Sequence, residues 1–318
     1  MRRLTTVGEL VQRTFCAWME DNGPQLGAAL SFYTALSLAP LVVIALKIAA
    51  LFFGEDAARG EIEHRLESFV GPVGGKVIQD ILANASLPIG ATIATAISVL
   101  TVLIAASGVF AELQQSLNKI WRVRLKANRS WFDLVRERFL PFVMVLGIAL
   151  LLLVLLTVSS LIMFAGTYLQ VWPPNRRWIA QAIDLALSLG IVTLLFALLY
   201  KVLPEVKIAW RDVLLGAAIT AILFTAGKFA IGLYLGQSTV ASSYGAAGSL
   251  MVLLIWIYYS AQIFYFGAEF TWVYASQFGS YIVPTPDAEP IPPDPRSPCK
   301  RASLTTNDTN LTNKDQER

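Results

Sequence analysis

Long stretches without a charged residue constrain this chain more than any other feature. Three of them cover residues 22–46, 81–111 and 139–175. A helix of about 20 apolar residues crosses the hydrocarbon core of a bilayer, because each residue adds about 1.5 Å to its length. The chain is 55% apolar and only 15% charged, whereas soluble domains carry about a quarter charged residues. The sequence therefore predicts an integral membrane protein.

Six segments are long and apolar enough to cross the membrane. They are too long and too continuous for the alternating strands of a membrane barrel, so helices are expected. We predict an all-α, polytopic membrane protein in which residues 1–279 form one domain, with amphipathic helices at the membrane interface. The predicted transmembrane helices cover residues 25–53, 87–111, 139–169, 178–203, 212–236 and 249–275.

The distribution of Lys and Arg predicts the orientation. With six spans, both termini lie on one side of the membrane. The segments on that side hold 18 of the 25 Lys and Arg residues, and those on the opposite side hold 5. Because cytoplasmic segments are enriched in Lys and Arg, both termini are expected in the cytoplasm. The first 20 residues lack the continuous apolar core of a cleavable signal peptide.

The segment after the second span, residues 112–138, combines aromatic and basic side chains. Leu113, Leu117 and Ile120 recur at helical spacing, and seven Lys or Arg residues lie in the segment. We expect a cytoplasmic amphipathic helix or elbow on the anionic headgroups of the bilayer. The same composition could contact RNA, but attachment to spans at both ends favours the membrane surface. A net charge of +3 does not indicate a nucleic-acid partner.

The composition changes near the C-terminus. Seven of the chain's 15 prolines lie between residues 284 and 298, and polar and charged residues follow. Such a segment buries too little apolar surface to order itself. Residues 280–318 are therefore predicted to be a disordered, Pro-rich cytoplasmic tail.

Small residues recur in two of the predicted spans. Helices in lipid associate through close contacts between small residues, so we interpret these seams as packing surfaces in preference to a substrate path. Pro40 ends the first seam and should bend its helix, because it lacks a backbone N–H. The seams consist of Gly27, Ser31, Ala35 and Ala39 in the first span, and of Gly216, Thr220, Gly232 and Gly236 in the fifth.

Polar side chains of the sixth span share one helical face. Tyr258, Gln262, Tyr265 and Glu269 are spaced by 4, 3 and 4 residues. A carboxylate inside a span is costly and often marks a functional site. Alternatively, Glu269 reaches the membrane surface or bonds to a neighbouring backbone. Both interpretations stay open.

The other charges within the spans suggest an ion pair. Asp184, Lys228 and Lys47 all fall in the outer third of the membrane, so we expect Asp184 to pair with Lys228 or Lys47. Glu269 lies near the opposite surface. It is expected to belong to a separate polar site with Gln262 or Arg211.

Four blocks of residues carry a family pattern. The blocks are residues 21–24 with 28–33 and 37–40, residues 113–121, residues 203–213, and residues 244–270. They resemble the YihY/BrkB family of bacterial inner-membrane proteins over about residues 15–278, and the last block is the most specific. Phe224 departs from the pattern, because the family often has Trp there.

The resemblance implies six spans in a bacterial inner membrane. The family was once labelled ribonuclease BN, but this chain contains a single histidine, His64, and no GxSxG motif. Metal-dependent hydrolysis needs clustered ligands, and metal-free cleavage commonly uses an acid/base pair. We therefore expect no enzyme activity, no catalytic residues, no metal and no cofactor.

The expected function is to handle or transport a lipid, another amphiphile or a small solute. A bent first span, small-residue seams and charges within the membrane are features that let helices separate around a cavity. The alternative is a non-transporting membrane scaffold, in which the basic elbow and the Pro-rich tail recruit partners.

Overall fold

The chain folds into two compact units. The computed structural model describes residues 7–54, 108–126, 177–237, 248–279 and 282–292, together with Gly60 and Gln79; for residues 39–53, 177–184, 235–237 and 249 it describes the backbone alone. Unit 1 comprises residues 1–21, 117–223 and 266–318, and unit 2 comprises residues 22–116 and 224–265. Two long helices, α7 and α9, contribute residues to both units.

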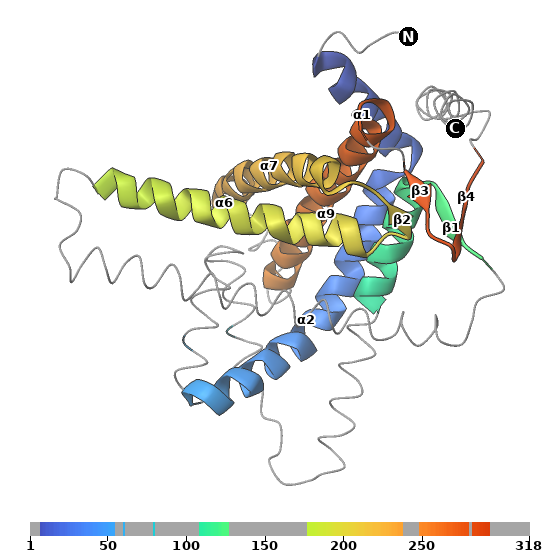
Figure 1. Ribbon diagram of the computed structural model, residues 1–318. Helices are drawn as coiled ribbons and strands as arrows, with labels where there is room; N and C mark the ends of the chain where they lie inside the picture. The colour runs from blue at the N-terminus through green and yellow to red at the C-terminus, as the bar shows by residue number, and fades with distance from the viewer. Residues whose placement is uncertain are drawn as a thin grey trace, which may run out of the picture. The chain divides into compact units, whose positions relative to one another are not determined.

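Four long helices occupy the positions of four predicted spans. They are α2 (Gly23–Phe53), α6 (Arg177–Val202), α7 (Trp210–Gln237) and α9 (Gly248–Gln277) (Figure 1). Of the residues that the structure describes, three stretches are long and apolar enough to cross a membrane: Leu185–Val202, Trp210–Tyr234 and Leu250–Gln277. The predicted spans 87–111 and 139–169 lie outside the described residues, except that 108–111 are helical. The protein is thus mostly helical, with three candidate membrane-spanning helices in its described part.

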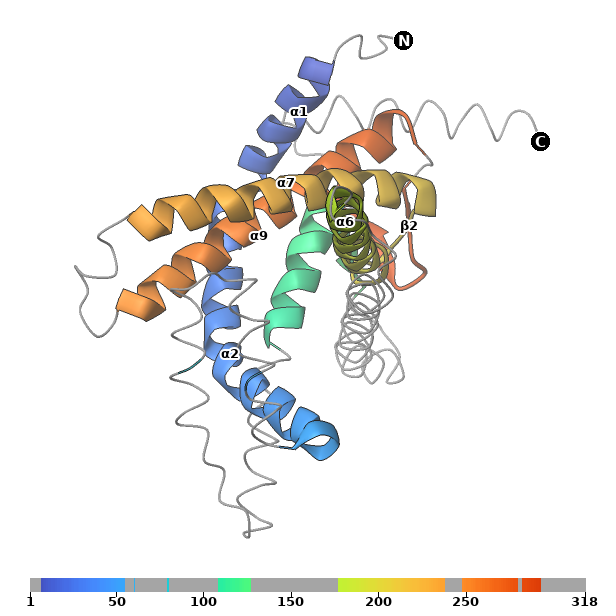
Figure 2. The same cartoon turned by 90° about the vertical axis from the view of Figure 1, so that its left-hand side faces the viewer.

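Helix α2 continues through Pro40. Figure 2 shows that the axis of α2 changes direction along its length, as a proline inside a helix requires. A shorter helix, α1 (Val7–Glu20), precedes it. Between the two, Asn22 has a φ of 58°, a left-handed conformation that Asn adopts more readily than most residues. The chain can therefore change direction within two residues.

The predicted amphipathic helix over residues 112–138 is wrong at residues 121–126. The helix that contains residues 108–120 ends at residue 120, and Arg122 has a left-handed φ of 57°. The chain then enters strand β1, Val123–Leu125. Leu117, Ile120 and Trp121 are each at most 1% exposed. These apolar side chains pack inside the protein. Residues 127–138 lie outside the described residues, so contact of the segment with headgroups stays a prediction.

The tail is ordered where disorder was predicted, at residues 282–292. Strand β3 (Val283–Pro284) pairs antiparallel with β2 (Val206–Lys207), and β4 (Ala288–Pro290) pairs antiparallel with β1 (Figure 1). The composition concealed these strands because they are short edge strands, in which proline is tolerated. The all-α prediction therefore missed two two-stranded sheets. Residues 293–318 lie outside the described residues.

One tail residue, Thr285, holds the loop before β2. Its hydroxyl donates to Glu205 Oε2 (3.0 Å), and its N–H donates to the Glu205 carbonyl (3.0 Å). A turn then leads into β4, closed by the N–H of Ala288 and the carbonyl of Thr285 at 3.1 Å. The tail is thus held to the loop before β2 by hydrogen bonds from both the side chain and the backbone of Thr285.

Helices α7 and α9 pack in unit 1 through two reciprocal contacts. Gly216 of α7 lies against Thr271 of α9, and Gly267 of α9 lies against Thr220 of α7; a Cβ at either glycine would overlap the threonine. Each threonine hydroxyl donates to the carbonyl four residues earlier, at 2.8 Å from Thr220 and 2.7 Å from Thr271. The residue order shows that the helices are antiparallel. They approach as closely as small residues allow, which is the main source of helix association in lipid.

We predict that Gly216→Ala destabilises the protein by about 1–3 kcal/mol, because the added methyl group overpacks the contact with Thr271. The midpoint of thermal unfolding in detergent measures the effect. Gly190→Ala in α6 is the matched control, since no described residue lies within 4 Å of a Cβ built there. Equal midpoints for the two variants would contradict a close α7–α9 contact.

We also predict that Thr285→Val exposes the tail to protease. The substitution keeps the shape of the side chain but removes the bond to the Glu205 carboxylate, which contributes about 1.5 kcal/mol as a bond to a charged group. Limited proteolysis should cut residues 282–292 several times faster. Thr285→Ser keeps the hydroxyl and should behave as the wild type. Identical cleavage of the Val and Ser variants would refute the role of the bond.

Candidate functional site

The polar residues predicted to share a face of α9 experience different surroundings along the helix. Helix α9 is continuous from Gly248 to Gln277, so Tyr258, Gln262, Tyr265 and Glu269 do lie on one face. Tyr258 and Gln262 are partly exposed, whereas Tyr265 and Glu269 are fully buried. The face therefore changes from an accessible part in unit 2 to a sealed part that ends in unit 1.

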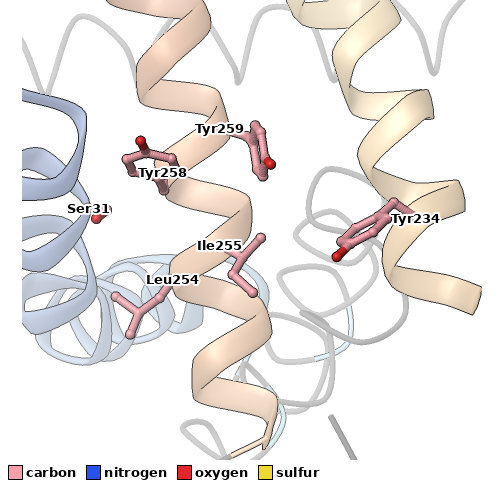
Figure 3. Close-up of a pocket in the computed structure, with 6 residues that line it drawn as sticks. All are labelled: Ser31, Tyr234, Leu254, Ile255, Tyr258 and Tyr259. Atoms are coloured by element: carbon pink, nitrogen blue, oxygen red, sulfur yellow. The ribbon is translucent and has the colours of Figure 1, made fainter. Parts of the chain in front are cut away.

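The accessible part borders a cavity of about 420 Å³ in unit 2. Figure 3 shows Ser31 of α2 and Tyr234 of α7 on opposite sides of α9, from which the other lining side chains project. The lining residues are Ser31, Tyr234, Leu254, Ile255, Tyr258 and Tyr259. We call these six residues the tyrosine groove.

The tyrosine groove is open and mixed in chemistry. Tyr234 is 59% exposed and Tyr259 is 47% exposed, so the cavity is accessible from outside the protein. The rings of Tyr258 and Tyr259 meet edge to face, with centroids 5.8 Å apart. The walls are aliphatic and aromatic, and the polar groups are hydroxyls. Such a surface suits a molecule that is mostly apolar and carries a few hydrogen-bonding groups.

The small-residue seam of α2 faces α9 beside the tyrosine groove. A Cβ at Gly27 would overlap the amide of Gln262, whose Nε2 donates to the Pro24 carbonyl at 3.4 Å. Ser31 is buried, and its hydroxyl donates to the Ala28 carbonyl at 2.8 Å. One turn further, Ala35 packs on the buried side chains of Leu253 and Ile257. The structure thus brings together three of the sequence-predicted residues, Gly27, Ser31 and Gln262, with Tyr258 along the same helix pair.

Other predicted residues lie elsewhere. Gln262 bonds to α2, and Arg211 is exposed at the start of α7 while Glu269 is 0% exposed. The Nζ of Lys228 lies 5.7 Å from the centroid of the Phe229 ring. The side chains of Asp184 and Lys47 are outside the described ones, so the expected ion pair stays a prediction. His64 also lies outside the described residues.

The second seam of α7, at Gly232 and Gly236, has no contact among the described residues. Gly232 is exposed, and no described residue lies within 4 Å of a Cβ built on it. The side chain of the next seam position, Gly236, is outside the described ones. The packing role of Gly232 therefore stays a prediction. A small residue permits close packing but does not specify which side of the helix has a neighbour.

Sequence reasoning missed four residues of the groove: Tyr234, Leu254, Ile255 and Tyr259. Tyr234 lies between Leu233 and Leu235, and Tyr259 directly follows Tyr258 and so lies off the face that Tyr258 shares with Gln262. Leu254 and Ile255 are apolar, like most residues of a span. The three tyrosines of the groove come from two helices, one from α7 and two from α9. Their proximity becomes visible only when the two helices are paired. Helix pairing is not encoded in the periodicity of either helix alone.

Sequence reasoning also missed a polar network that joins three loops of unit 1. Lys119 Nζ donates to the Asp21 carbonyl (2.6 Å), and the Asp21 carboxylate lies 3.7 Å from Arg122. The side-chain oxygen of Asn118 accepts the N–H of Glu205 (2.9 Å). Three of the four blocks that carry the family resemblance thus meet at these residues. The blocks themselves were the available signal, because their polar residues lie at helix ends and not within spans.

Comparison with known families agrees with this picture. The model of a family described as virulence factor BrkB matches residues 14–292. The match begins within α1 and ends just after β4, so it includes the ordered part of the tail.

Curated relatives are membrane proteins. A UPF0761 membrane protein of Ralstonia nicotianae is 28% identical over 251 residues, which cover 78% of this chain and 55% of that protein; the chain thus spans about half the length of this relative. UPF0761 membrane proteins of Tolumonas auensis and Alteromonas mediterranea are 28% and 27% identical, over 79% of this chain and 80% and 83% of theirs. No solved structure matches the chain. Since the family model covers most of its length, this chain belongs to the YihY/BrkB family of membrane proteins.

Proposed function

We propose that this protein handles a lipid, another amphiphile or a small solute within the bacterial inner membrane. It crosses the membrane six times, with both termini in the cytoplasm, and acts without enzymatic chemistry. The observation that carries the proposal is the tyrosine groove, a cavity of about 420 Å³ beside α2, α7 and α9. Its volume falls in the range of about 300–1,000 Å³ typical of small-molecule sites.

The groove favours an amphiphile over a polar solute. Leu254, Ile255 and the tyrosine rings offer an apolar path for an alkyl chain. The hydroxyls of Tyr234, Tyr258 and Tyr259 supply donors and acceptors without charge. None of the six lining side chains is charged. An apolar ligand therefore covers no charged group when it binds, and binding avoids the cost of removing water from a charge.

The contacts in unit 1 support the proposed topology. The charge distribution assigns the N-terminus, the segment after span two, the segment after span four and the tail to one side of the membrane. Residues from all four meet: Lys119 bonds to Asp21, Asn118 to Glu205, and Glu205 to Thr285. Segments that are in direct contact outside the spans must lie on the same side of the membrane. The contacts therefore agree with a topology in which an even number of spans separates each of these segments from the next.

A non-transporting scaffold is the second candidate, and one observation favours it. The ordered strands of unit 1 present charged side chains to solvent, including Lys207 and the exposed pair Arg124–Glu289 (2.6 Å). Trp210, at the start of α7, is 46% exposed, and the Nζ of Lys201 lies 5.8 Å from the centroid of its ring. Exposed aromatic and basic residues on a rigid base can bind a partner.

Filling the groove should separate the two candidates. Leu254→Trp places a larger ring in the cavity, so we predict a severalfold loss of lipid that co-purifies with the protein, measured by mass spectrometry after mild detergent extraction. Leu185→Trp is the matched control, because Leu185 is 60% exposed on α6 and is not one of the residues that line the groove. Both variants should show the unfolding midpoint of the wild type. Equal lipid content in the two variants would favour the scaffold.

Reporter fusions test the topology. Green fluorescent protein joined after residue 292 should fluoresce and alkaline phosphatase joined there should be inactive, because only the first matures in the cytoplasm and only the second requires export. The same two fusions after residue 175, between the third and fourth predicted spans, should give the opposite result. An active phosphatase after residue 292 would contradict the proposed orientation.

A further inference from the structure

Helix α1 has one face fixed to the protein. Thr14 is 0% exposed and Ala17 is 1% exposed. The ring of Trp18 meets that of Phe266 in α9 edge to face, with centroids 6.5 Å apart. Both residues belong to unit 1. This face holds the helix in a defined rotation.

A second face of α1 presents bulky apolar side chains away from the protein. Val11, Phe15 and Met19 are 48%, 54% and 51% exposed, and they follow one another at intervals of four residues. At about 100° per residue this spacing makes one continuous stripe. We call these three residues the α1 stripe. Such a stripe is expensive to leave in water and marks a surface that contacts something apolar.

The third face of α1 is polar. Glu9 and Gln12 are exposed, and Arg13 is partly exposed on the same side. The helix is therefore divided into an inner face, an apolar face and a polar face. That division is typical of a helix lying at a membrane surface beside a bundle, because lipid, water and protein each meet one side.

The chain connection fixes where α1 lies along the membrane normal. Only Asp21 and Asn22 separate the end of α1 from the start of α2. The first residues of α2 are at the membrane surface if α2 is a span, so the C-terminal end of α1 is within a few residues of the headgroups. A stripe of aliphatic, aromatic and thioether groups at this depth matches the boundary between headgroups and acyl chains.

We infer that α1 is an interfacial anchor whose stripe, Val11, Phe15 and Met19, inserts into the lipid leaflet at which α2 begins. The occupant of this surface is the bilayer itself, and not a protein partner. The net charge of residues 1–21 is zero, with three arginines and three carboxylates, so apolar contact and not attraction to anionic headgroups drives the insertion. The inference rests on the proposed span at α2, but it needs neither the tyrosine groove nor the cytoplasmic orientation.

Photo-crosslinking in a bilayer tests the inference. The full-length protein carries p-benzoyl-phenylalanine in place of Phe15 or, separately, Met19, and is reconstituted in vesicles of phosphatidylethanolamine and phosphatidylglycerol. After illumination, mass spectrometry should find phospholipid adducts at both positions. The same amino acid in place of Glu9, on the polar face of the same helix, should give at least severalfold fewer adducts. Using two exposed positions guards against one variant that fails to fold.

A label in place of Phe229 separates failure of this inference from failure of the proposed function. Phe229 is 65% exposed on α7, in a candidate membrane-spanning stretch, and should react with lipid. Adducts at Phe229 but not at Phe15 and Met19 would overturn the anchor and leave the spans standing. Crosslinks from Phe15 to a second copy of the chain would also overturn it, because the stripe would then be a protein interface. Absence of adducts at Phe229 would count against the membrane topology itself.

Discussion

The contact between α7 and α9 determines how the rest of unit 1 is built. In lipid, apolar helices have no hydrophobic driving force to associate, so helix association depends on packing that is closer between helices than between helix and lipid. Gly216 and Gly267 permit that approach, and the opposing threonines satisfy their hydroxyls within their own helices. The hydroxyl of Tyr200 in α6 lies 3.2 Å from that of Thr220. Three helices are therefore fixed at one place, and the rotation of α9 is fixed with them.

The ends of the helices pose a different problem. Backbone groups outside regular structure need partners, and turns between spans cannot be left unsatisfied near hydrocarbon. In unit 1 the short strands β1 to β4, the side chains of Asn118 and Lys119, and the backbone N–H of Thr285 supply those partners. This explains why the family-like blocks contain polar residues at helix ends, where they hold loops.

Helix positions could be predicted from the sequence because membrane thickness and backbone bonding leave few alternatives: α2, α6, α7 and α9 begin and end within a few residues of the predicted spans. The strands of the tail could not, because composition reports apolar burial and these strands depend on pairing with distant residues, such as Val123 with Pro290. Gly27 and Ser31 were found by their spacing. Tyr234 was not, because a groove residue on a separate helix leaves no local pattern.

The single polar face of α9 does not make a single site. Glu269 is sealed in unit 1, where a charge is costly and exchange with solvent is blocked. Tyr258 borders an open cavity, where binding and release require no rearrangement of the helix core. A residue that meets a mobile ligand needs access, whereas one that fixes a helix needs burial. If the tyrosine groove binds an amphiphile, as proposed, the accessible end of α9 meets the ligand while the buried end packs inside unit 1.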